Sequence, residues 1–149
     1  MRMRVALFVA VLSACVVHSL AAQAKPNFSG RWVQIAPASP DDGGGTEQVV
    51  TQDAKTLTAE HPSEGGQHRQ VYKLDGESQF ATGPVTSVSK TTWDGPKLVI
   101  STTSTYPGDR KRESKQVWSL GADGMLTIEA SSKNPDGTTT EIKIVHRKK

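Results

Sequence analysis

The sequence predicts an all-β protein, an antiparallel up-and-down β-barrel of about eight to ten strands. Two observations favour this fold: Asp-Gly pairs interrupt the chain, and the runs between them are rich in Thr, Ser, Val and Ile. Asp-Gly between such runs is a strong hairpin signal, because tight turns need positive φ angles that glycine adopts at little steric cost. No apolar period of 3.6 residues persists long enough to predict a helix.

Four Asp-Gly pairs and the segment YPGDR mark the predicted turns: Asp75-Gly76, Asp94-Gly95, Asp123-Gly124, Asp136-Gly137 and residues 106–110. The intervening runs predict strands at 30–35, 46–52, 55–61, 68–74, 85–93, 97–105, 112–120, 125–132 and 138–146. Several runs alternate apolar and polar residues, as Leu126 and Ile128 do near one end of the chain. This period of two predicts strands with one buried and one wet face.

The short connections between the predicted strands favour a closed sheet. Closing a sheet on itself removes its exposed edges, whereas a two-layer sandwich usually needs longer Greek-key crossovers. An open sheet or a sandwich remains the alternative. The one long connection is the Pro- and Gly-rich segment 36–45, which its composition predicts to be a mobile loop.

Residues 1–24 have the features of a signal peptide: two arginines, an apolar run over 5–17, and alanines at 22 and 24 that fit a cleavage site. The apolar run is shorter than the roughly 20 residues of a membrane helix, so no integral membrane span is expected. The segment LSAC is similar to a bacterial lipobox and makes Cys15 an alternative lipidation site. We therefore expect a periplasmic or secreted protein or, in the second interpretation, an outer-membrane lipoprotein anchored through Cys15.

Removal of this leader leaves one domain, 25–149, that contains no cysteine and owes nothing to disulfides. It also lowers the formal net charge from +3 to +1, because the arginines at 2 and 4 are lost. This charge gives no reason to expect a nucleic-acid partner or an anionic membrane surface. Aromatic residues make up only 5% of the sequence, so the core is expected to be small or partly polar.

The stretch SGRW, residues 29–32, resembles the Gly-x-Trp of the first lipocalin strand and, more loosely, that of the wider calycin group. The pattern FSGRW…VVTQDAKTLT…YKLDG…TTWDGPKLVI…WSLGADGMLTIEAS is similar to small exported lipocalin-like proteins of bacteria over nearly all of 25–149. The resemblance implies that Trp32 plugs the closed end of the barrel, with Gly30 leaving room for neighbouring rings. Its expected floor consists of residues such as Leu126, Ile128 and Ile142. The sequence departs from lipocalins in that no helix is predicted after the last strand.

The same resemblance implies a non-enzymatic exported module that binds a small hydrophobic or amphiphilic ligand. Tyr72, Gln116 and Trp118 are expected to line the cavity; the alternative is that the two aromatic rings fill the core. A different class of function also stays open, an envelope scaffold or protease-inhibitor-like barrel that acts through its surface and the segment 36–45. Whether the barrel is hollow or filled distinguishes these hypotheses.

No motif indicates catalysis, a cofactor or a metal. No serine, histidine and acid are linked by a known catalytic motif. The segment EHPSEGGQH, 60–68, contains His61 and His68, but its spacing matches no zinc-ligand motif, and we interpret it as a solvated glycine-rich hairpin loop. The basic segments 109–115 and 146–149 are interpreted as solvated strand ends that oppose edge pairing.

Overall fold

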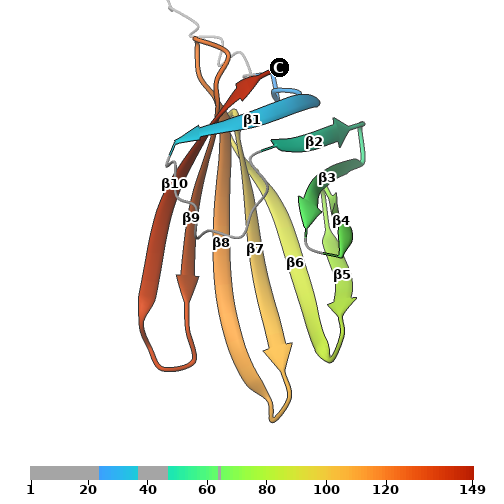
Figure 1. Cartoon of the computed structure of the whole chain (residues 1–149), viewed down its shortest axis with the longest axis vertical. Coiled ribbons are helices and arrows are strands. Elements are labelled where there is room, and N and C mark those ends of the chain that lie inside the picture. Colours follow the sequence, from blue (N-terminus) through green and yellow to red (C-terminus); the bar gives the residue numbers. More distant parts are fainter. Residues whose placement is uncertain (1–23, 37–46, 64) are drawn as a thin grey trace, which may run out of the picture.

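The structure is a computed structural model that describes residues 24–36, 47–63 and 65–149. Ten antiparallel strands follow one another (Figure 1), and the described residues contain no helix. The strands are β1 (Gly30–Ala36), β2 (Glu47–Gln52), β3 (Thr56–Ser63), β4 (Gly66–Lys73), β5 (Glu77–Thr82), β6 (Val85–Asp94), β7 (Lys97–Tyr106), β8 (Arg110–Leu120), β9 (Leu126–Lys133) and β10 (Thr139–Lys148). The expected leader with Cys15, apart from Ala24, and the expected loop, apart from Ala36, lie outside the described residues.

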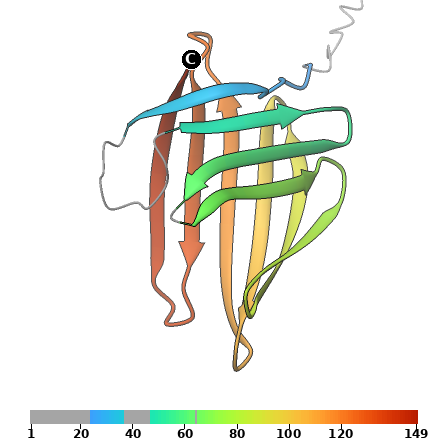
Figure 2. The ribbon, with the colours of Figure 1, turned by 45° about the vertical axis from the view of Figure 1, so that its right-hand side comes forward.

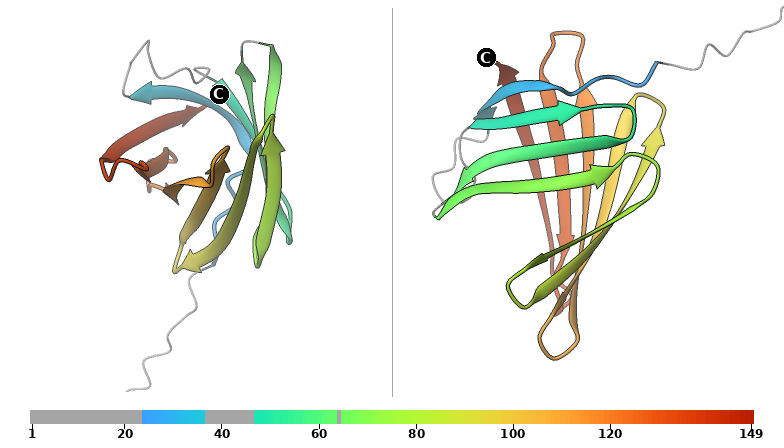
Figure 3. Two further views of the ribbon diagram at one scale, coloured as in Figure 1. Left: turned by 90° about the horizontal axis from the view of Figure 1, so that it is seen from below. Right: turned by 90° about the vertical axis from the view of Figure 1, so that its right-hand side faces the viewer.

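All ten strands belong to one sheet in the order β4-β3-β2-β1-β10-β9-β8-β7-β6-β5. Pairing of the first strand with the last joins the two ends of the chain. Strands β1 to β4 run across strands β6 to β10 (Figures 2 and 3), so the sheet wraps around one interior. The predicted up-and-down barrel is confirmed as a nearly closed, lipocalin-like barrel.

The glycines of the predicted turns explain the hairpins among the long strands. Gly95, Gly124 and Gly137 have φ angles of 56°, 76° and 84°, in the region that favours glycine. In the YPGDR turn, Gly108 and Asp109 have φ angles of 80° and 57°. These turns join β6 to β7, β8 to β9, β9 to β10 and β7 to β8, so the hairpin predictions at these positions are confirmed.

The predicted hairpin at Asp75-Gly76 is wrong, because β4 and β5 stand at opposite edges of the sheet order and form no ladder between described residues. The backbone donors of this connection have other partners. The amide of Leu74 donates to the carbonyl of Lys55 at 2.8 Å, and the amide of Lys73 donates to Ser78 Oγ at 2.7 Å. Leu74 is also buried. The Leu74 hydrogen bond continues the β3–β4 ladder, so β4 stays paired with β3 while β5 pairs with β6, and the barrel wall has a seam between β4 and β5.

The sequence prediction also missed β5. Its run, ESQFAT, has one aromatic residue and no β-branched residue before Thr82, so its local strand signal is weak. In the structure it pairs along its whole length with β6, with Ser78 opposite Ser89. Tertiary pairing therefore makes this segment a strand.

One end of the barrel, beside β1 and the C-terminus (Figure 1), is filled by an apolar core. Nine of its side chains are at most 2% exposed: Phe28, Trp32, Val50, Leu57, Tyr72, Leu98, Ile100, Trp118 and Leu126. The indole Nε1 of Trp32 donates to the Phe28 carbonyl at 2.9 Å, which satisfies the ring's one polar group. Trp32 is thus a fully buried residue of the filled end.

Two of the three residues expected to form the floor of Trp32 are buried with it. Leu126 and Ile128 belong to the same buried cluster as Trp32, whereas Ile142 does not. The register gives the reason: Leu126 lies opposite His146, and Ile142 lies opposite Ala130, farther along the strands from the filled end.

Gly30 is needed for a different reason from the one expected. Its φ angle is 152°, and a Cβ there would lie 2.8 Å from Lys148 Cε but an ordinary 3.5 Å from Trp32 Nε1. Lys148 Nζ in turn lies 5.7 Å from the centroid of the Trp32 ring. Glycine is therefore needed at this position because it adopts the positive φ angle and leaves room for the Lys148 side chain. That side chain covers the tryptophan ring, which itself does not require the glycine.

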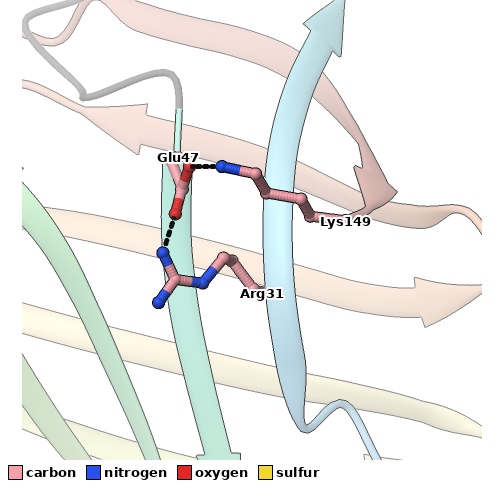
Figure 4. A network of polar contacts seen from close by, with 3 residues as sticks. All are labelled: Arg31, Glu47 and Lys149. Atoms are coloured by element: carbon pink, nitrogen blue, oxygen red, sulfur yellow. Dashed lines mark hydrogen bonds and ion pairs between the residues drawn. The ribbon is translucent and has the colours of Figure 1, made fainter.

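Three charged side chains tie the first, second and last strands together on the outer surface (Figure 4). Glu47 accepts from Arg31 Nη1 at 2.6 Å and from Lys149 Nζ at 3.1 Å. The hydrogen bonds from Lys149 and Arg31 lower the pKa of Glu47. Since exposed ion pairs contribute little stability, this network adds little to the free energy that closes the barrel.

Candidate functional site

The barrel interior next to the filled end contains a pocket of about 190 Å³. Its walls come from β1 to β4 and β8 to β10, and the lining residues are Gln34, Gln48, Ala59, His61, Gln70, Tyr72, Gln116, Trp118, Ile128, Ala130, Ile144 and His146. The structure therefore brings Tyr72, Gln116 and Trp118, assigned from the sequence to a ligand cavity, to one pocket. Tyr72 and Trp118 are also members of the buried core, so each ring packs in the core and borders the pocket.

Strand register places these side chains on the inner face. Trp118 lies opposite Ile128, which lies opposite Ile144, and together they form an apolar row across three strands. The next inward row has Gln116 opposite Ala130. Because alternate residues of a strand point to opposite faces, Val117 between these rows faces outward. The small Ala130 beside Gln116 leaves space that a larger residue would fill.

Two glutamines of the pocket each accept a hydrogen bond from a buried aromatic residue two positions later in the sequence. Trp118 Nε1 donates to Gln116 Oε1 at 2.9 Å, and the Tyr72 hydroxyl donates to Gln70 Oε1 at 2.6 Å. Both pairs belong to the same tripeptide pattern, Gln-Val-aromatic, at 70–72 and 116–118. Burial raises the pKa of Tyr72 to about 12, so its hydroxyl stays protonated at physiological pH.

His146 is a buried polar residue in the same wall. Its Nε2 lies 3.4 Å from Gln48 Nε2, and its Nδ1 has no hydrogen-bond partner among the described residues. Burial lowers the pKa of His146, and the backbone of Leu126, which lies opposite it, offsets part of that shift. His146 is therefore neutral at pH 7.

His61 and His68 do not lie in the solvated loop expected from the sequence. They stand opposite each other on β3 and β4, with ring centroids 4.9 Å apart, because β3 continues to Ser63 and β4 begins at Gly66, so both strands are longer than predicted. His61 is half-buried and lines the pocket. Burial and the facing His68 lower the pKa of His61, which is therefore also neutral at pH 7.

Hydroxyl groups replace apolar side chains farther from the filled end. Ser89 Oγ lies 2.6 Å from Thr102 Oγ1, and Ser87 Oγ lies 2.8 Å from Ser104 Oγ. Ser78, Ser87, Ser89 and Thr91 are buried. The partly polar core expected from the composition is therefore found in this half of the interior.

Two larger hollows, of about 410 and 490 Å³, lie over β7 to β10. Most of their lining side chains, such as Lys115, Glu129 and Lys143, alternate out of phase with the buried Trp118 and Ile128, so they face outward. These hollows are open grooves on the outer face of the sheet. The interior pocket is less open than either groove, and apolar and polar groups converge in it.

Sequence reasoning missed Gln48, Gln70 and His146. The repeated Gln-Val-aromatic tripeptide is a signal that could have identified Gln70, since its two copies contain all three predicted ligand-binding residues, Tyr72, Gln116 and Trp118. No local signal identifies Gln48 or His146, which meet only because β2 and β10 both pair with β1.

Within the described ranges, no group of three or more His, Cys, Asp or Glu is placed to hold a metal ion. The same part of the chain contains no helix long and apolar enough to cross a lipid bilayer.

Neither models of protein families nor curated proteins give a match to this sequence. Solved structures give matches to its fold. A secretory abundant heat soluble protein from Ramazzottius varieornatus aligns with a TM-score of 0.61 and 12% identity, over 87% of this chain and 100% of that one. The secretory abundant heat soluble protein 4 of the same organism aligns with a TM-score of 0.52 and 16% identity, over 81% and 94%. Human cRBP IV, a cellular retinol-binding protein, has a TM-score of 0.52 and 12% identity, over 83% and 99%.

These neighbours are lipocalin-like barrels, so the predicted fold class is confirmed. At such low identities the similarity concerns the fold alone. The resemblance to small exported bacterial proteins stays a prediction.

Proposed function

We propose that this protein is a non-enzymatic, exported binding module that holds one small hydrophobic or amphiphilic ligand inside its barrel. The observation that best supports this function is the interior pocket of about 190 Å³ lined by Tyr72, Gln116 and Trp118. Sites for drug-sized ligands usually measure about 300–1,000 Å³, so the ligand is smaller or extends from the pocket toward the barrel mouth. The name of one neighbour, cRBP IV, supports an interior ligand of this general kind without identifying it.

The mixed lining of the pocket suits an amphiphile. Trp118, Ile128 and Ile144 present an apolar surface, and Gln48, Gln70, Gln116 and His146 present polar groups. Burial of apolar ligand surface supplies affinity, and a few placed polar groups supply orientation. The lining contains no Ser, Cys, Lys, Asp or Glu, so its two histidines have neither a usual nucleophile to activate nor a carboxylate to orient them. This lining favours binding over catalysis.

Native mass spectrometry of the protein purified from its own source tests the proposal. We expect a complex heavier than the chain by the mass of one small molecule, and loss of that mass after unfolding and refolding. Ala130→Leu, which fills the pocket, should abolish the complex, whereas the neighbouring, outward-facing Ser131→Leu should retain it. A bare chain in every preparation would count against a ligand.

The same spectra test export. A chain that begins at Lys25 supports cleavage after Ala24, and an acylated chain that begins at Cys15 supports the lipoprotein alternative. A chain that still begins at Met1 would contradict both forms of processing.

A further inference from the structure

We propose that the pocket selects uncharged ligands that have a hydrogen-bond acceptor oxygen, and that the side-chain amides of Gln70 and Gln116 donate to it. This inference rests on the proposed ligand-binding function and specifies its ligand class. It depends on the two aromatic-bonded glutamines and on the charge of the pocket wall.

The first step is the orientation of the two amides. The Trp118 indole is a donor only, so Gln116 must turn its carbonyl oxygen toward the indole and its NH₂ group away. The Tyr72 hydroxyl donates to Gln70 Oε1, which orients the second amide in the same sense. Both aromatic residues are 2% exposed, so their rings are fixed by the core. The core thus sets the direction of two polar groups that it does not bury.

The second step is that these NH₂ groups are available. Among the described residues, no hydrogen bond is found for Nε2 of Gln70 or of Gln116. Both side chains line the pocket, one from β4 and the other from β8. A ligand that enters therefore meets amide donors on two different walls, and an acceptor oxygen is the group that satisfies a donor.

The third step is the exclusion of charge. None of the lining residues is Lys, Arg, Asp or Glu. A buried carboxylate or ammonium group without a partner of opposite charge loses its hydration and gains no ion pair in return. A ketone, ester, amide or alcohol accepts the same hydrogen bonds without that cost. The pocket wall therefore discriminates between head groups of similar size.

A matched set of probes tests the inference: 2-nonanone, nonanoate and nonylammonium share a tail and differ in the head group. Titration calorimetry at neutral pH should give affinity for the ketone at least about ten times that for either ion. The isosteric variants Gln70→Met and Gln116→Met should each weaken ketone binding by about two- to tenfold, the range of one hydrogen bond. Gln67→Met, an exposed position on the same strand as Gln70, is the matched control and should bind the ketone as the wild type does.

Tyr72→Phe provides a second readout, because it removes the hydroxyl that orients Gln70 and keeps the ring. Ketone affinity should fall while the urea midpoint, followed by circular dichroism, confirms that each variant is folded. If the wild type binds nonanoate as tightly as the ketone, or if both glutamine variants retain full ketone affinity, the inference is wrong and the binding function stands. If the wild type binds none of the three probes, the proposed function fails and the inference falls with it.

Discussion

The filled end and the pocket of this barrel are built from the same alternating strands, and they differ in which side chains point inward. At the filled end, the inward residues are Trp32, Leu98 and Leu126, all at most 2% exposed. Farther along the same sheet, Gln116 and Ala130 occupy inward positions. Long apolar side chains interdigitate and exclude solvent, whereas short or polar ones leave a cavity. The difference shows that inward side-chain size, not strand pairing, decides where this barrel is hollow.

Trp32→Ala tests the filled end and should have the largest effect. Truncation of a large buried ring typically costs about 3–5 kcal/mol, because transfer free energy is lost and a cavity remains. Since domains have only about 5–15 kcal/mol of stability, the variant should be barely folded at 37 °C. Urea unfolding followed by circular dichroism measures the change.

Gln116→Met is the matched substitution in the pocket wall and should shift the urea midpoint far less. Trp118 is as buried as Trp32, so Trp118→Ala should also destabilise the protein strongly. Equal urea midpoints for the wild type and Trp32→Ala would contradict the role of Trp32 in the filled end.

Ser89→Ala tests the hydroxyl-lined half and should have a moderate effect. Ser89 is fully buried and its Oγ lies 2.6 Å from Thr102 Oγ1, so the substitution leaves the threonine hydroxyl without its partner. We expect a loss of about 1 kcal/mol of unfolding free energy, measured in urea. Ser101→Ala, on the exposed face of the same strand as Thr102, should be nearly neutral. A Ser89→Ala variant more stable than the wild type would mean that this half of the barrel gains from apolar filling.

Acidification tests the neutral pocket wall and should produce the most gradual change. The pKa values of His61 and His146 are lowered from the ordinary 6.5 in the folded protein, so the unfolded chain binds more protons. The free energy of unfolding should therefore decrease as the pH falls below about 6.5. Urea midpoints measured between about pH 7 and pH 5 check this, and His146→Gln should reduce the slope. A midpoint that rises on acidification would contradict the assignment of neutral buried rings.

Local sequence chemistry determined most of the architecture. The Asp-Gly pairs and the period of two specified the hairpins, because positive φ at Gly95, Gly124 and Gly137 is a local requirement that glycine meets. The same reasoning failed at Asp75-Gly76, where Leu74 is buried and its amide donates to the distant Lys55 carbonyl, so that β4 pairs with β3 and not with β5. It also missed β5, whose pairing with β6 compensates for a weak local signal.

The site was predictable only in part, and the reason is the range of the interactions. Tyr72, Gln116 and Trp118 could be proposed from residue type, since aromatic rings and amides are useful in a cavity. The register between strands decides the rest of the site: it brings Gln70 to the same pocket, places Gln48 beside His146, and sets His61 against the pocket wall. A shift of one residue in register would turn each of these side chains to the outer face.

The sequence by itself determined that this chain forms β-hairpins with one wet and one buried face, because those preferences are local. Only the tertiary structure decided which polar residues face inward together, because closure through β1 and β10 brings strands from both ends of the chain around one interior.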